Sequence, residues 1–167
     1  PLTVVNYTLL GCASGFTLAT AYAALAAPGL VGLYTACAIG LILMALITRS
    51  ASLLRNARLR PKSTLQSAIG VRDPRIVQKA QGFMGGSFNT REFFHGRPGS
   101  WLRCIKWIFL VLAFPVPVAL LGIGVAGDFP PALVLAFVIQ YVGLIAERWF
   151  FFAQANHPQN LYYQTIG

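Results

Sequence analysis

Ionisable side chains are rare in the apolar parts of this sequence, and Glu147 and Arg148 are the most conspicuous of them. An ionisable group at membrane depth is costly and usually has a function. The residues at 139–144 are uncharged, so Glu147 needs a partner from another segment or exchanges a proton. His157 lies ten residues further on and is a third candidate for proton exchange. The alternative is an ordinary place at the membrane interface, where Arg and aromatic residues gather.

A second group of polar residues, Arg91, Glu92 and His95, lies within the stretch 82–96. That stretch mixes glycines, charges and aromatic side chains, a composition typical of a docking surface or the rim of a pocket. Arg91, Glu92 and His95 are therefore candidates for docking a partner protein or for lining the rim of a pocket.

Cysteine and histidine patterns indicate no metal site and no haem. Cys12, Cys37 and Cys104 are far apart and form no CxxC pair of the kind that binds iron–sulfur clusters or zinc. We expect all three to be buried small residues. A haem held between two membrane helices needs two axial histidines inside the helices, and His95 and His157 both lie outside the apolar runs.

Composition nearly excludes a soluble globular domain. The chain of 167 residues is 56% hydrophobic and 10% charged, with a mean hydropathy of +0.65, whereas average soluble domains carry roughly 25% charged residues. The net charge is +9, and twelve of the thirteen basic residues lie between Arg49 and Lys106. Because the charge belongs to one segment of an apolar chain, we expect a lipid bilayer and no nucleic acid as its partner.

Four apolar runs are long enough to cross the membrane, since a helix needs roughly 20 residues to span about 30 Å of hydrocarbon. They are separated by a Pro28-Gly29 break, by the basic segment and by a turn at 127–130. The predicted spans are about 3–26, 30–48, 105–126 and 131–153.

The predicted fold is therefore an all-α integral membrane protein with four transmembrane helices in two hairpins. The first hairpin occupies 1–48 and the second 105–153, joined by a structured basic central loop at 49–104 and followed by a tail at 154–167. The chain begins at Pro1 with no basic stretch and no cleavage site of a signal peptide. We therefore expect the four helices to be part of a larger bundle.

Details inside the predicted spans indicate how they pack. Gly11 and Gly15 lie one turn apart on one face, which allows a close approach between helices. Pro115 and Pro117 remove backbone donors and should kink the third span. Basic residues at both ends of the central loop predict that this loop and both termini are cytoplasmic.

Three blocks of the sequence carry a family resemblance, the third in two parts: TLQSAIGVRDPRI at 64–76, GFMGGSFNTREFFHG at 82–96, and AERWFFFA at 146–153 with HPQNLYY at 157–163. They resemble the membrane anchor subunit of the dimethyl sulfoxide reductase family, one of the complex iron–sulfur molybdoenzymes. The resemblance places this chain in the C-terminal half of a subunit with about eight spans, and so in half of an eight-helix bundle.

The resemblance implies a multi-pass subunit of the bacterial inner membrane that oxidises menaquinol in anaerobic respiration. It binds no haem and reduces no terminal acceptor itself, but passes electrons to an iron–sulfur subunit, which feeds a molybdopterin-containing catalytic subunit. Glu147, Arg148 and His157 are then candidates for quinol or proton transfer. The family's best-known quinol-site histidine and acid lie in the other half, so that site is carried over to no residue here. The family's catalytic subunits are exported, which would place the central loop on the opposite face from the charge rule.

Two other classes of protein stay open. A half-domain of a secondary transporter would also have four spans, but it would more often carry paired charges in mid-span, and here the mid-span regions are uncharged. A purely structural membrane assembly protein would lack any electron-transfer role. Bound quinone in the purified protein would distinguish it from the anchor subunit.

Overall fold

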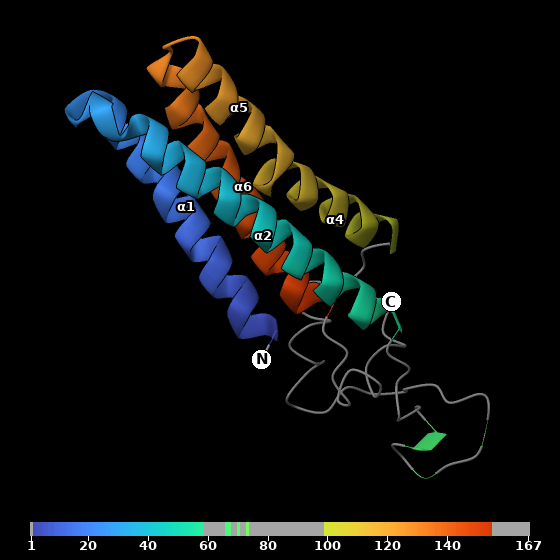
Figure 1. Cartoon of the computed structure of the whole chain (residues 1–167). Coiled ribbons are helices and arrows are strands. Elements are labelled where there is room, and N and C mark those ends of the chain that lie inside the picture. Colours follow the sequence, from blue (N-terminus) through green and yellow to red (C-terminus); the bar gives the residue numbers. More distant parts are fainter. Residues whose placement is uncertain (1, 59–65, 68–69, 71–72, 74–98, 155–167) are drawn as a thin grey trace, which may run out of the picture. The chain divides into compact units, whose positions relative to one another are not determined.

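The computed structural model describes residues 2–58, 66–67, 70, 73 and 99–154, and every regular element in them is helical (Figure 1). The elements are α1 (Leu2–Ala26), the single 3-10 turn η1 (Pro28–Leu30), α2 (Val31–Arg58), α4 (Gly99–Ala113), α5 (Pro115–Ala126) and α6 (Pro130–Ala153). Four helical stretches are long and apolar enough to cross a membrane: Leu2–Ala26, Pro28–Arg58, Gly99–Ala126 and Pro130–Ala153. The predicted all-helical fold with four spans is confirmed.

The chain divides into two compact units. The first consists of Pro1–Arg58 and Lys106–Glu147, and contains most of both hairpins. The second consists of Leu59–Ile105 and Arg148–Gly167. Most of the central loop lies outside the described residues. Within it, Gln66 and Ser67 are helical, and Gly70 has a φ of +72°, a left-handed conformation that commonly ends a helix.

The ends of the spans agree with the prediction at the turns and differ at the basic segment. α2 continues ten residues past Thr48 to Arg58, and α4 starts at Gly99 rather than at 105. Charged residues end an apolar run, but arginine and lysine are good helix formers and do not end a helix. The helices are therefore longer than the apolar runs that they contain.

The buried residues of the helices repeat at alternating steps of three and four, as in a left-handed helix bundle. Along α1 they include Asn6, Leu10, Ala13, Thr17 and Thr20; along α2, Thr35, Ala38, Ile42, Ala45, Arg49 and Ser52; along α6, Ala136, Gln140, Gly143, Glu147 and Phe150. Many of these residues are small, which lets the helix backbones approach one another.

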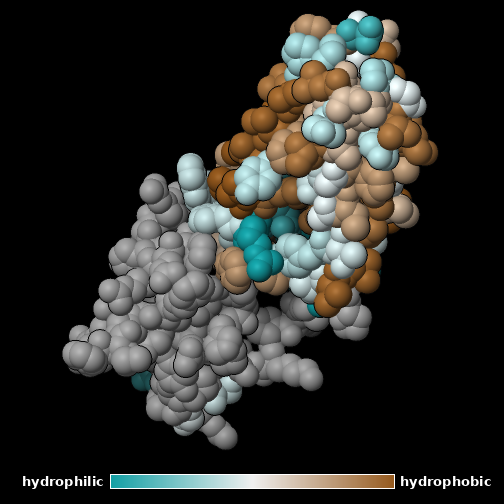
Figure 2. Space-filling view, turned by 90° about the vertical axis from the view of Figure 1, so that its left-hand side faces the viewer, coloured by the Kyte–Doolittle hydropathy of each residue, from teal (hydrophilic) through white to brown (hydrophobic). Residues whose placement is uncertain are grey.

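Large apolar side chains lie mostly on the outside of the helices. Leu18, Leu25, Leu33, Ile47 and Ile145 are among those exposed. Figure 2 shows that apolar side chains cover much of the visible surface of the described helices. Polar residues inside and apolar residues outside suit an environment of hydrocarbon rather than water. The distribution supports a multi-pass membrane protein.

The two turns and the break in the third span follow from local sequence. Pro115 and Pro117 follow a break in the third span at Phe114, whose backbone is non-helical at φ −123° and ψ −77°. At the turn between α5 and α6, Asp128 has a φ of +46°, and the amide of Phe129 donates to the carbonyl of Gly124 at 2.9 Å.

No other part of the described chain approaches Gly11 or Gly15, so close helix packing at these glycines stays a prediction. A Cβ added at either glycine would meet nothing within 4 Å, because α2 packs against the other face of α1, which carries Ala13 and Thr17. Helix contact occurs instead at Gly143. A Cβ there would lie 2.6 Å from the backbone nitrogen of Ala113 in α4.

The cysteines also differ from the prediction. Cys12 and Cys104 are exposed and Cys37 is half-buried. Only Cys37 comes near the expected role of a small buried residue. Hydropathy places a cysteine in a span, but it does not tell which side of the helix faces the protein.

Candidate functional site

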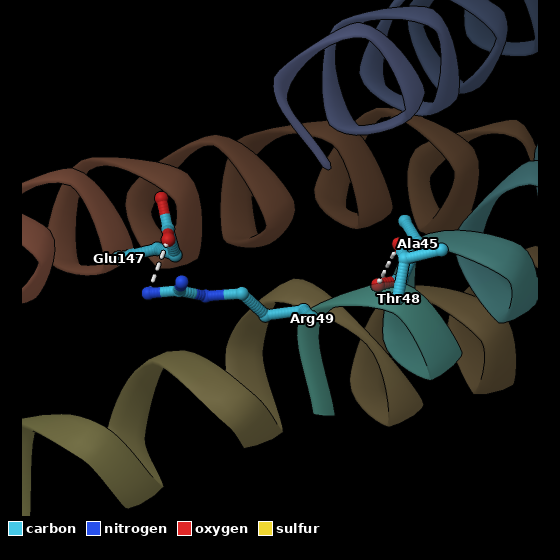
Figure 3. A network of polar contacts seen from close by, with 4 residues as sticks. All are labelled: Ala45, Thr48, Arg49 and Glu147. Carbon is cyan, nitrogen blue, oxygen red and sulfur yellow. Dashed lines mark hydrogen bonds and ion pairs between the residues drawn. The ribbon is translucent and has the colours of Figure 1, made fainter. Parts of the chain in front are cut away.

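Two opposite charges meet inside the first unit, Arg49 of α2 and Glu147 of α6 (Figure 3). The Nη2 atom of Arg49 lies 2.6 Å from Oε1 of Glu147, and each residue is 2% exposed. That separation is typical of a short, charge-assisted contact. The pair is electrically neutral as a whole, which is the state that an apolar interior tolerates best.

The repeat of buried residues along α2 positions Arg49. Arg49 follows Ala45 by one turn, and both are on the face turned towards the rest of the unit. The neighbouring Thr48 turns back instead, and its hydroxyl donates to the carbonyls of Ala45, at 3.2 Å, and Met44, at 3.1 Å. Figure 3 shows Thr48 held against its own helix while Arg49 reaches across to α6.

α4 completes the surroundings of the pair. The Cζ atom of Arg49 lies 5.5 Å from the centre of the Phe109 ring, and Phe109 is fully buried. A guanidinium over an aromatic face at this distance gains a cation–π attraction. One turn before Glu147, Gly143 brings α6 against the backbone of Leu112 and Ala113. The site therefore lies where α2, α4 and α6 meet.

Further polar groups are buried in the same unit without a hydrogen-bond partner. They are Oδ1 of Asn6, Oγ1 of Thr35, Oε1 of Gln140 and Nε of Arg49, a statement limited to the described residues. Gln140 lies two turns before Glu147 on the same face of α6. Buried polar atoms normally have partners, so these positions are candidates for contacts with a further molecule.

The chemistry available here is that of protons and hydrogen bonds. A carboxylate can accept and release a proton, and a guanidinium stays charged and stabilises the ionised carboxylate. In the described ranges no three His, Cys, Asp or Glu side chains gather as metal ligands do.

The structure describes two of the predicted site residues, Glu147 and Arg148, and places them in different surroundings. Glu147 has the partner across the bundle that its isolated position in the sequence required. Arg148 is exposed and belongs to the second unit. There its Cζ atom lies 4.9 Å from the ring centre of Phe152 and 5.8 Å from that of Phe151. His157 and the predicted docking residues Arg91, Glu92 and His95 lie outside the described residues.

Arg49 is the functional candidate that sequence reasoning missed. Its position at the end of the second span is typical of the basic residues that orient a helix in the membrane. A signal was present in the sequence, because Thr35, Ala38, Ile42, Ala45 and Arg49 continue one repeat of three and four residues. An arginine that continues the buried face of a span is predicted to lie inside the protein.

Comparison with known proteins gives one strong similarity. The chain is 54% identical, over all of its 167 residues, to a sulfite dehydrogenase subunit of Allochromatium vinosum. It spans about half of that curated relative, 51% of its length. No family model matches the chain, and no solved structure matches it. The relative is named for a sulfite dehydrogenase, not for the dimethyl sulfoxide reductase that the sequence blocks resemble.

Proposed function

We propose that this chain forms part of the membrane subunit of a sulfite dehydrogenase-like molybdoenzyme complex, and that it passes electrons between a partner subunit and a quinone in the bilayer. The observation that carries the proposal is the 54% identity, over the whole chain, to the sulfite dehydrogenase subunit of Allochromatium vinosum. Four helices able to cross a membrane support the role of a membrane subunit. The oxidation of sulfite itself is assigned to a partner.

The relative's name supports electron flow from sulfite to the quinone. Oxidation of sulfite to sulfate, with water as the source of the added oxygen atom, releases two electrons and two protons, and reduction of a quinone to a quinol consumes two of each. We assign the second half-reaction to the membrane subunit. The electrons arrive from outside this chain, through an iron–sulfur subunit that is fed by a molybdopterin-containing catalytic subunit.

A second candidate keeps the membrane role and reverses the electron flow. In it the subunit oxidises menaquinol, and a dimethyl sulfoxide reductase-like complex reduces the terminal acceptor in anaerobic respiration. The sequence blocks at 64–76, 82–96 and 146–153 favour this candidate. Both candidates place the chain in the inner membrane of a bacterium, with the central loop and its Arg91, Glu92 and His95 as the docking segment for the partner subunits.

Within this proposal, Glu147 is the candidate for proton exchange with the quinone. It is a carboxylate inside the apolar unit, beside the guanidinium of Arg49, and a carboxylate can accept and release a proton. Turnover per assembled complex is therefore expected to fall at least tenfold in Glu147→Gln. Equal turnover per assembled complex would remove Glu147 from the proton path.

The test is purification of the tagged full-length protein from its native membranes in mild detergent. Iron and molybdenum should elute with it, and sulfite should drive the reduction of added decylubiquinone. A preparation from cells lacking the gene for this protein is the control, and it should oxidise sulfite only with a soluble artificial acceptor.

Three results would change the proposal. Menaquinol-dependent reduction of dimethyl sulfoxide without sulfite oxidation would select the second candidate. Partner subunits that elute with the protein and transfer electrons to quinone equally well without it would indicate a structural assembly protein. Elution alone and free of metal, in conditions that keep related complexes intact, would favour a half-domain of a transporter.

A further inference from the structure

We propose that the Arg49–Glu147 ion pair is the contact by which the two hairpins recognise each other, and that it fixes α2 and α6 as parallel neighbours. The first hairpin supplies the buried cation and the second the buried anion. In the part of the chain that the structure describes, no other Asp, Glu, Lys or Arg is buried. The inference concerns the assembly of the chain, so it does not depend on the proposed electron transfer.

The two charges lie at the same depth. Arg49 follows Val31, the first residue of α2, by eighteen residues, and Glu147 follows Pro130, the first residue of α6, by seventeen. At about 1.5 Å per residue, both lie about 26 Å along their helices from the two turns. The hydrocarbon layer is about 30 Å thick. Both charges therefore lie just inside its edge, on the side of the basic segment.

An arginine at this depth has an alternative to burial. Its long side chain can extend to the nearby headgroups at little cost, as such residues commonly do near the ends of membrane helices. Arg49 instead turns inward, where it is 2% exposed against Glu147 and Phe109. Arg55, six residues later on α2, is exposed. The inward orientation of Arg49 is thus explained by its partner on the other hairpin.

Apolar contacts alone give the hairpins little basis for selecting one another. Lipid tails are as apolar as leucine side chains, so membrane helices associate through close packing and polar contacts. Glu147 is costly while its hairpin stands alone, because its short side chain cannot reach the headgroups as an arginine can, and the cost is relieved only when α2 and α6 lie side by side. A wrong neighbour, a shift of one turn or an antiparallel arrangement would leave the Glu147 carboxylate unpaired in hydrocarbon.

The test is a double-mutant cycle on the full chain in detergent micelles, with unfolding by sodium dodecyl sulfate as the measurement. Arg49→Met and Glu147→Gln each leave one buried charge without its partner. Each should lower the ratio of folded to unfolded protein at least tenfold, which is about 1.4 kcal/mol. The double variant carries neither charge, and its loss should be at least fivefold smaller than the product of the two single losses.

Matched controls separate pairing from loss of charge. Arg55→Met removes an exposed arginine from the same helix, and Asp128→Asn removes an exposed acid. Both should leave the ratio within about twofold of the parent. Single variants as stable as these controls would overturn the proposal, and so would a double variant whose loss equals the product of the single losses.

A charge exchange covers the case in which the single variants fail to accumulate. Arg49→Glu combined with Glu147→Arg restores opposite charges at the same depth, and it should accumulate in the membrane when either change alone does not. If neither the charge exchange nor the neutral double variant accumulates in the membrane, the proposal is contradicted, because pairing requires both of them to restore accumulation.

Discussion

Gly143→Ala tests whether α6 touches the backbone of α4 as the structure has it. The added Cβ would lie 2.6 Å from the nitrogen of Ala113 and 2.7 Å from the carbonyl carbon of Leu112. Ordinary contacts begin at 3.4 Å, so the helices must separate by about 0.8 Å, and both clashing atoms are backbone. Overpacking of this kind costs about 1–3 kcal/mol.

The assay is thermal unfolding in detergent, compared with Gly122→Ala. Alanine is a better helix former than glycine by about 1 kcal/mol, and this gain is common to both variants. A Cβ at Gly122 meets nothing within 4 Å, so the control isolates the gain. At about 2–4 °C per kcal/mol for a chain of this size, Gly143→Ala should unfold about 2–12 °C below the control. A melting temperature equal to the control's would refute the contact between α4 and α6.

Three further outcomes are expected. Asp128→Val should lower the melting temperature by about 2–8 °C, because a branched side chain at a φ of +46° costs about 1–2 kcal/mol. Asp128→Gly should not lower the melting temperature. Equal melting temperatures for the two variants would contradict the backbone conformation of Asp128. Asn6→Leu should leave the melting temperature unchanged or raise it by a few degrees, since Oδ1 of Asn6 is buried without a hydrogen-bond partner; a lower value would mean that Asn6 has a partner in the native protein. Green fluorescent protein fused after Gly167 should fluoresce and alkaline phosphatase fused there should be inactive, because the basic central loop predicts a cytoplasmic C-terminus. Active phosphatase would show that the C-terminus lies on the opposite face of the membrane.

Hydropathy was sufficient to place the spans because the apolar runs are uncharged and are bounded by clear breaks. Pro28-Gly29 and the turn at 127–130 mark the helix ends to within one or two residues. At the basic segment the helices continue past the predicted spans, since Arg49, Arg55 and Arg58 lie in a helix that extends beyond the apolar run. A charged side chain ends an apolar run, but it does not by itself end a helix.

Of the two residues of the ion pair, only Glu147 was predictable from the sequence. Glu147 stands apart from any basic residue in the preceding turns of its own helix, so its need for a distant partner followed from the cost of a lone buried charge. The choice of Arg49 did not follow, because twelve basic residues lie between Arg49 and Lys106 and only the packing of α2 against α6 selects one. The same limit explains Gly11 and Gly143: small residues permit close contact, but the arrangement of helices decides where contact occurs.

α2 is longer than the hydrocarbon layer of a membrane is thick. Its 28 residues extend about 42 Å, about 12 Å more than the hydrocarbon layer. The last two turns, with the exposed Arg55 and Arg58, thus extend beyond the hydrocarbon layer as a continuous helix. Because the helix is already ordered, its backbone has no conformational freedom left to lose in this part. The overhang therefore presents these two arginines at a fixed height beyond the hydrocarbon layer.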